Sequence, residues 1–74
     1  MKNRAMLLCI KHDIKTIEEY ALRIGVSTSR AEAIVKEKAV LTQEEIEANC
    51  RLFNVSADYF LALVEEFFYF AKED

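Results

Sequence analysis

The sequence contains no proline, no tryptophan and only one glycine among its 74 residues. Sheet-rich folds rely on glycine and proline at their many turns, so this composition disfavours them and favours a compact helical fold. A chain of this length is near the lower limit for one stable core, and we expect a single domain over residues 1–74. The hydrophobic content of 53% is high for so small a chain, so either the core is dense or some apolar surface faces a partner.

Side chains suited to metal binding and catalysis are also scarce. Two cysteines, Cys9 and Cys50, and one histidine, His12, are too few for a zinc site. We expect both thiols to be free and to fill the core, the alternative being a redox sensor. The sequence has no phosphate-binding loop and no nucleophile with a base beside it. We therefore expect neither an enzyme nor a bound cofactor or metal.

No apolar stretch approaches the ~20 residues that a membrane-spanning helix requires. The start of the chain also lacks the pattern of a signal peptide, so we expect a cytoplasmic protein that does not enter a membrane. Charge is unevenly distributed. Residues 1–40 carry eight basic and five acidic side chains, a net +3, whereas residues 41–74 carry two and eight, a net −6. A polyanionic partner is therefore expected to meet the N-terminal half.

Residues that start and stop helices divide the chain into five expected helices. The first covers about residues 3–12. The four later helices are expected to begin after the capping residues Thr16, Ser27, Thr42 and Ser56. Gly25 and Asn54 end the second and fourth helices, because both residues tolerate the left-handed conformation that follows a helix. The last helix is expected to run over about residues 57–71.

Two segments, "TIEEYALRIGVSTSRAEAI" from Thr16 and "LTQEEIEANCRLFNVSADYFL" up to Leu61, carry a resemblance to a known family. Their spacings, the turn at Gly25 and the ending "NVSADYFL" resemble the lambda-repressor/Cro-like helix-turn-helix family, of xenobiotic-response-element type. The resemblance implies an all-α fold, a compact five-helix lambda-repressor-like DNA-binding domain, with its helix-turn-helix motif over about residues 16–36. In this chain an extended aromatic C-terminal helix is expected to follow.

In that family the second helix of the motif enters the major groove of DNA. Carried over by position, the implied DNA-binding residues are Thr16, Ser27, Thr28, Ser29, Arg30, Ala33, Lys36 and Lys38. Arg30 would make a bidentate contact with guanine, and the alternative is a solvated arginine that pairs with Glu32. Glu32 itself has three open roles: it repels phosphates, it faces solvent, or it accepts from a cytosine amino group.

The C-terminal segment has more aromatic side chains than one face of one helix needs. We expect a dimer or partner interface there, formed by Phe60, Val64, Phe67, Phe68, Tyr69 and Phe70. The alternative is a helix that folds back to complete a small core. Asn49 occupies an inward position, where it is either a buried and hydrogen-bonded polar residue or a sign that its helix faces a partner.

Two hypotheses from different classes follow. The first is a small sequence-specific transcriptional regulator of phage, prophage or plasmid type, which binds double-stranded DNA as a homodimer. The second is a protein-binding modulator or antirepressor that keeps the fold but binds another regulatory protein. Residue types that are unusual for the family favour the second hypothesis, and they lie at Ile17, Glu32, Ala33 and Val35.

Overall fold

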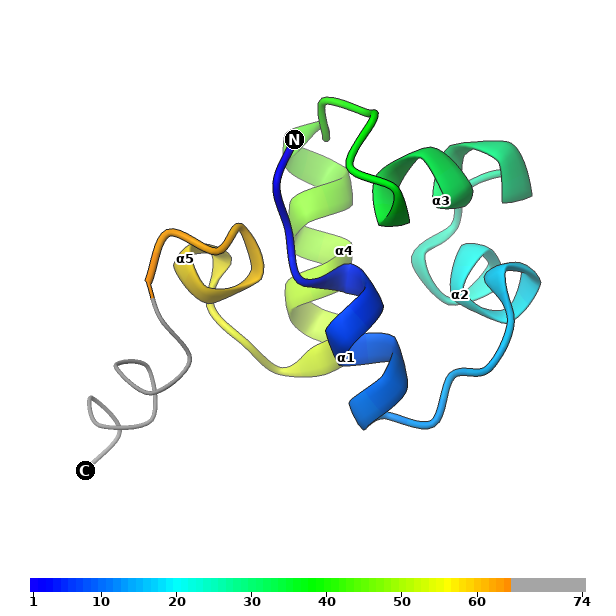
Figure 1. Ribbon diagram of the computed structural model, residues 1–74, viewed down its shortest axis with the longest axis horizontal. Helices are drawn as coiled ribbons and strands as arrows, with labels where there is room; N and C mark the ends of the chain where they lie inside the picture. The colour runs from blue at the N-terminus through cyan, green and yellow to red at the C-terminus, as the bar shows by residue number, and fades with distance from the viewer. Residues whose placement is uncertain (65–74) are drawn as a thin grey trace.

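The computed structural model describes residues 1–64 of the chain, which form five helices and no strand. In chain order these are α1 (Ala5–Lys11), α2 (Ile17–Ile24), α3 (Thr28–Val35), α4 (Gln43–Phe53) and α5 (Ala57–Phe60). Helix α1 lies in front of α4, with α5 on one side and the α2–α3 pair on the other (Figure 1). The expected small all-helical fold of five helices is confirmed. None of the described helices is long and apolar enough to cross a membrane.

The predicted helix caps are confirmed. Thr16, Ser27, Thr42 and Ser56 precede helices α2 to α5, and each hydroxyl oxygen accepts a hydrogen bond from a backbone N–H in the first turn. At Thr42 the Glu45 carboxylate also accepts from the cap's own N–H at 2.8 Å, which completes a capping box. Helix α1 has no hydroxyl cap, and the side-chain oxygen of Asn3 instead accepts a hydrogen bond from the Ala5 N–H at 2.9 Å.

Every described helix is followed by a residue in the left-handed conformation. These residues and their φ angles are Asp13 (60°), Gly25 (77°), Glu37 (62°), Asn54 (56°) and Ala62 (60°). At each position the chain turns back, so that backbone N–H groups beyond the helix donate to carbonyls of its last turn. Only one of the five is glycine, although a left-handed conformation is unfavourable for most other residues.

The predicted C-terminal helix over residues 57–71 is wrong in its length. Helix α5 has four residues, since Ala62 adopts a φ of 60° and the Leu63 N–H donates to the Asp58 carbonyl at 2.8 Å. This bond closes the helix end and directs the chain away from the helix axis. The remaining part of the expected helix, residues 65–71, lies outside the described residues.

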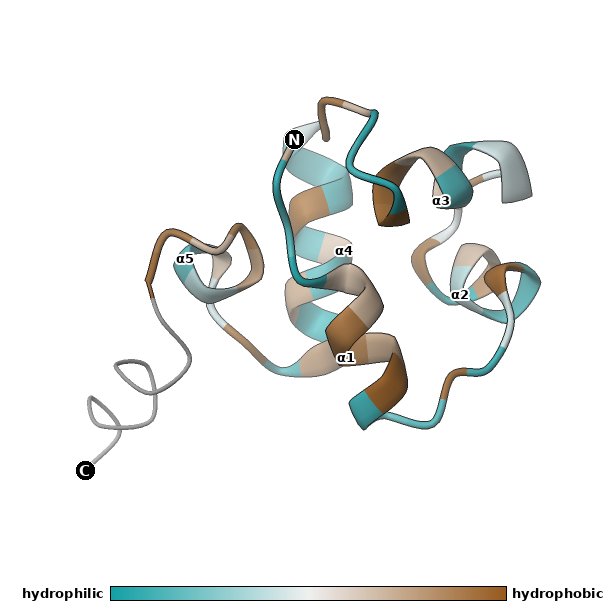
Figure 2. Cartoon of the chain, viewed as in Figure 1, coloured by the Kyte–Doolittle hydropathy of each residue, from teal (hydrophilic) through white to brown (hydrophobic). Residues whose placement is uncertain are grey.

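Side chains from all five helices fill one hydrophobic core. The largest apolar or aromatic side chains that are fully buried in it are Tyr20, Tyr59, Phe60 and Ile34. Cys9 is buried and Cys50 is half-buried, both as free thiols, in agreement with their expected place in the core. Hydropathy differs among the helices, and Figure 2 shows that α1 is almost entirely hydrophobic until it ends at Lys11.

Asn49 is a fully buried polar residue with partners at both ends of its amide. Its Nδ2 donates to the Glu45 carbonyl at 2.8 Å, and its Oδ1 accepts from the Tyr20 hydroxyl. Burial raises the pKa of Tyr20 above its ordinary value, which keeps the hydroxyl protonated as the donor. Asn49 therefore links α4 to α2 inside the core, and the alternative that it faces a partner is wrong.

Candidate nucleic-acid interface

Helices α2 and α3 pack against each other through the short turn at residues 25–27. Gly25 has a φ of 77°, and its N–H and that of Val26 donate to the Ala21 carbonyl at 2.9 and 3.0 Å. A Cβ on Gly25 would meet nothing within 4 Å, so the turn requires glycine for its backbone conformation and not for space. The turn places the start of α3 beside α2 at one end of the molecule (Figure 1).

The outward face of α3 consists of Thr28, Ser29, Glu32, Ala33 and Lys36. Ala33 is half-buried and the other four residues are exposed. Their spacing of three or four positions puts them on one side of the helix, while Ala31 and Ile34 on the opposite side are fully buried. The structure therefore brings four of the predicted DNA-binding residues together on one open surface, with Glu32 among them.

The caps of α2 and α3 belong to the same end of the molecule. The Thr16 hydroxyl accepts from the Glu19 N–H at 3.0 Å, and the Ser27 hydroxyl accepts from the Arg30 N–H at 3.1 Å. A hydroxyl that accepts in this way still has its own hydrogen to donate. Both caps are exposed at helix N-termini, where the partial positive charge of the backbone favours anions.

Arg30 lies on the flank of α3 that faces α4 and not on the outward face. Its Nε and Nη2 each lie 2.8 Å from a Glu45 carboxylate oxygen, and Nη2 also donates to the Val40 carbonyl at 2.8 Å. The expected pairing with Glu32 is wrong, since the partner is Glu45. Because these contacts occupy the guanidinium fork, Arg30 does not present it for the expected bidentate contact with guanine.

The Arg30–Glu45 pair also sets the charge state of its carboxylate. The hydrogen bond from Arg30 is the largest of the effects that hold the pKa of Glu45 at about 2, and the Thr42 backbone N–H adds to it. The same contact raises the pKa of Arg30 above its ordinary value. Glu45 thus stays ionised at neutral pH, where it binds α3 to the first turn of α4.

Lysine and glutamate offset each other on the outward face. The Lys36 Nζ lies 3.1 Å from a Glu32 carboxylate oxygen one turn earlier, and both side chains are 54% exposed. An ion pair this exposed adds little to stability, and solvent and salt compete with it readily. Lys38 is exposed in the loop after α3. Glu32 therefore has a partner within the protein and lowers the net charge of the face.

Part of the predicted aromatic interface lies inside the protein. Phe60 is 0% exposed, and its carbonyl accepts from the Arg4 N–H at 2.8 Å, so its assignment to an open interface is wrong. The ring lies in the core because α5 packs with this side against the other buried residues. Val64 is half-buried. The other predicted interface residues, Phe67, Phe68, Tyr69 and Phe70, lie outside the described residues.

Helix α1 carries an apolar surface that no pattern in the sequence predicts. Met6 is 56% exposed and Ile10 is 70% exposed, and both belong to the apolar run of the first helix. The run "AMLLCI" has no helical period, so it gives no signal of which positions face outward. Only the packing of α1 on the other helices separates its buried residues from these two.

Among residues 1–64, no group of three or more His, Cys, Asp or Glu side chains is arranged to hold a metal ion. In comparisons with known proteins, no family model, no curated protein sequence and no solved structure matches this chain.

Proposed function

We propose that this protein is a small sequence-specific DNA-binding transcriptional regulator that works as a homodimer. We assign it to the lambda-repressor/Cro-like helix-turn-helix family, of phage, prophage or plasmid type. The observation that carries the proposal is the outward face of α3, whose short polar side chains are exposed directly after an N-terminal cap. The resemblance of the sequence to that family supports the same function.

Every residue of this face except Glu32 has a DNA contact that its chemistry suits. The hydroxyls of Thr28 and Ser29 both donate and accept, so they bind base edges in the major groove. The methyl group of Ala33, one turn further, contacts a thymine methyl group. The exposed N-termini capped by Thr16 and Ser27 receive backbone phosphates, as does the Lys36 ammonium when phosphate displaces Glu32.

The charges of the face predict weak and moderately salt-dependent binding. Each phosphate that a protein neutralises contributes about −0.9 to the slope of log affinity against log salt. With Arg30 paired to Glu45 and Lys36 paired to Glu32, few cations are free to neutralise phosphates. We therefore expect log affinity for DNA to fall less steeply with log salt than it does for a strongly basic repressor. We also expect a homodimer, in which two such faces bind the same duplex and raise the affinity for DNA.

The test is binding to a pool of random duplex DNA at ~50 mM and ~200 mM salt, with affinity falling as phosphate contacts are screened. Ser29→Glu places a carboxylate on the outward face of α3 and should weaken binding at least about tenfold, which is ~1.4 kcal/mol. Ala57→Glu is the matched control, because it adds the same charge to the exposed first turn of α5. No binding of the unmodified protein at the lower salt, or equal effects of both substitutions, would contradict the proposal.

A second candidate function is a protein-binding modulator, such as an antirepressor. Two observations favour it: the Arg30 guanidinium is occupied by Glu45, and Glu32 places a carboxylate on the face that would meet DNA. The duplex experiment separates the candidates. A protein that folds normally but does not bind DNA at ~50 mM salt, where electrostatic contacts are strongest, would support the modulator.

A further inference from the structure

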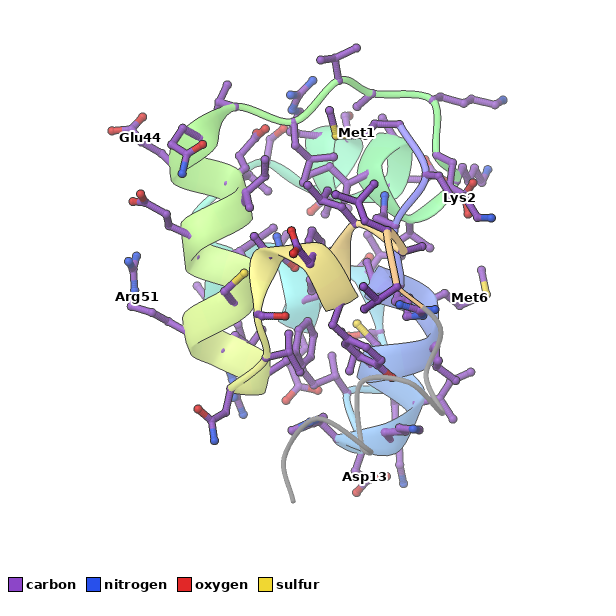
Figure 3. All side chains as sticks on the ribbon, turned by 90° about the vertical axis from the view of Figure 1, so that its left-hand side faces the viewer. Met1, Lys2, Met6, Asp13, Glu44 and Arg51 are labelled. Carbon is purple, nitrogen blue, oxygen red and sulfur yellow. The ribbon has the colours of Figure 1, made fainter. Side chains whose placement is uncertain are left out.

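An apolar groove of about 230 Å³ opens between α1, the start of α2 and the end of α3. Its apolar lining includes Met6, Cys9, Ile10, Ile17 and Val35. Met6 and Ile10, one turn apart on α1, form its outer edge, and Figure 3 shows Met6 projecting outward from that helix.

This edge differs from the other exposed apolar residues of the described chain. Leu22 and Val40 are also highly exposed, but neither lines this groove. Leu22 borders a separate hollow that it shares with the charged residues Arg23 and Arg51. Met6 and Ile10 extend the apolar lining of the groove to the surface, which makes a continuous patch. Patches of this kind mark sites where another apolar surface binds.

We propose that this groove binds the aromatic segment at residues 67–70 of a second copy of the chain. The proposal rests on the homodimer of the proposed function and identifies the surfaces that form it. The segment reads "EEFFYFAKED" from residue 65, with four consecutive aromatic residues between acidic ends. The edge of the groove carries Lys15, which is 77% exposed and lies 3.7 Å from Asp13. An ion pair this exposed is readily displaced, so Lys15 suits the acidic flanks of the segment.

The geometry favours a second copy over the same chain. The described chain ends at Val64, which shares a pocket with Lys2 and Arg4 at the start of α1. Helix α5 lies on one side of α1, and the α2–α3 pair lies on the other (Figure 1). The groove is lined by residues of α1, α2 and α3 and by none of α5. Three further residues to Phe67 extend at most about 10 Å. A helix with its side chains is about 10–12 Å wide, so three residues are too few to carry the same chain from Val64 across α1, whereas a second copy has no such limit.

The aromatic segment is large enough to supply the area that a stable dimer needs. Aromatic side chains bury about 150–250 Å² each, so four of them supply about 600–1,000 Å² per copy. Stable interfaces bury about 800 Å² per partner. A two-fold dimer repeats the contact, since each copy offers both a groove and a segment. The aromatic side chains that exceed the volume of the groove cover Met6 and Ile10 at its edge.

Sedimentation equilibrium of three single variants tests the two surfaces. Ile10→Glu places a charge in the groove, and Phe68→Ser removes an aromatic ring from the segment. Each should raise the dimer dissociation constant at least 100-fold, with the helical circular dichroism unchanged. Leu22→Glu is the matched control, since it charges an equally exposed apolar residue away from the groove, and its dissociation constant should equal that of the unmodified protein.

A mixing experiment separates exchange between copies from folding back within one chain. In a Cys9→Ala, Cys50→Ala background, one protein carries Ile10→Cys and another carries Phe68→Cys. On mild oxidation the mixture should form a disulfide-linked mixed dimer, while a chain with both substitutions should form linked dimers and not an internally bridged monomer.

Three results would overturn the inference: an internal bridge in the doubly substituted chain, a dimer that Ile10→Glu leaves intact, or a monomeric unmodified protein. A dimer that Ile10→Glu leaves intact would refute only the groove as the binding surface, and the homodimer itself would remain. The third refutes the homodimer as well. DNA binding is measured separately, so its failure or success is distinguishable from all three.

Discussion

The inner and outer sides of α3 differ in what their side chains contact. On the inner side Ala31 and Ile34 are fully buried, and Arg30 pairs with the first turn of α4. On the outer side Thr28 and Ser29 are exposed to solvent. The inner side therefore determines where α3 lies and how stable the fold is. The outer side carries little of that stability, which leaves its residue types free to serve binding.

The largest loss of stability is expected from Ile34→Ala. Ile34 is 0% exposed, and truncation of a fully buried isoleucine costs about 2–5 kcal/mol of unfolding free energy. Urea unfolding followed by circular dichroism measures the loss. Val40→Ala is the control, because Val40 is 74% exposed and its truncation should change stability by less than about 0.5 kcal/mol. Similar losses from the two substitutions would contradict the described packing of α3.

A smaller effect is expected from the Arg30–Glu45 pair, and it depends on pH. The folded pKa of Glu45 is about 2, below the ordinary 4.5, so the stabilisation is present above pH 4.5 and is lost as pH falls towards 2. Urea midpoints at pH 7 and pH 3 should therefore differ more for the unmodified protein than for Glu45→Gln.

The matched control for this pH dependence is Glu19→Gln. Glu19 lies 3.4 Å from Arg23 in an ion pair within α2 whose side chains are both well exposed. Exposed pairs contribute little, so this variant should keep the pH dependence of the unmodified protein. If Glu45→Gln keeps it as well, the Arg30 contact does not stabilise α3 as described.

The smallest change in stability is expected at the turn after α3. Glu37 has a φ of 62°, and Glu37→Gly should raise the unfolding free energy by about 0.5–1 kcal/mol, because glycine adopts this conformation without a steric cost. Gly25→Ala, at a φ of 77°, should lower it by about 1 kcal/mol. Thermal unfolding measures both, and a loss of stability in Glu37→Gly would refute this account of the turn.

The starts and ends of the helices are predicted well because short-range contacts within a few residues determine them. Ser27 and Thr42 bind N–H groups three residues later, so the caps of α3 and α4 can be recognised without knowledge of the rest of the fold. Gly25 and Asn54 likewise mark helix ends through their own conformational preferences. The exposed face of α3 follows from the same helix boundaries and the helical period.

Features that depend on packing could not be predicted in this way. Arg30 and Glu45 are 15 positions apart, and only the approach of α3 to α4 brings them together. Glu37 and Ala62 end their helices in a conformation that neither residue favours, so the sequence gives no sign of it. The burial of Phe60 follows from the packing of α5 on the start of the chain, where the Arg4 N–H donates to the Phe60 carbonyl.

The most direct test of DNA binding through α3 is a titration of the isotopically labelled protein with duplex DNA, followed by backbone amide chemical shifts at ~50 mM salt. We expect the largest shifts at Ser27, Thr28, Ser29 and Lys36 and at the start of α2. Asp58 should not shift, because α5 lies on the other side of α1 from α2 and α3 (Figure 1). No shifts at this salt, or shifts concentrated on α4 and α5, would contradict the account.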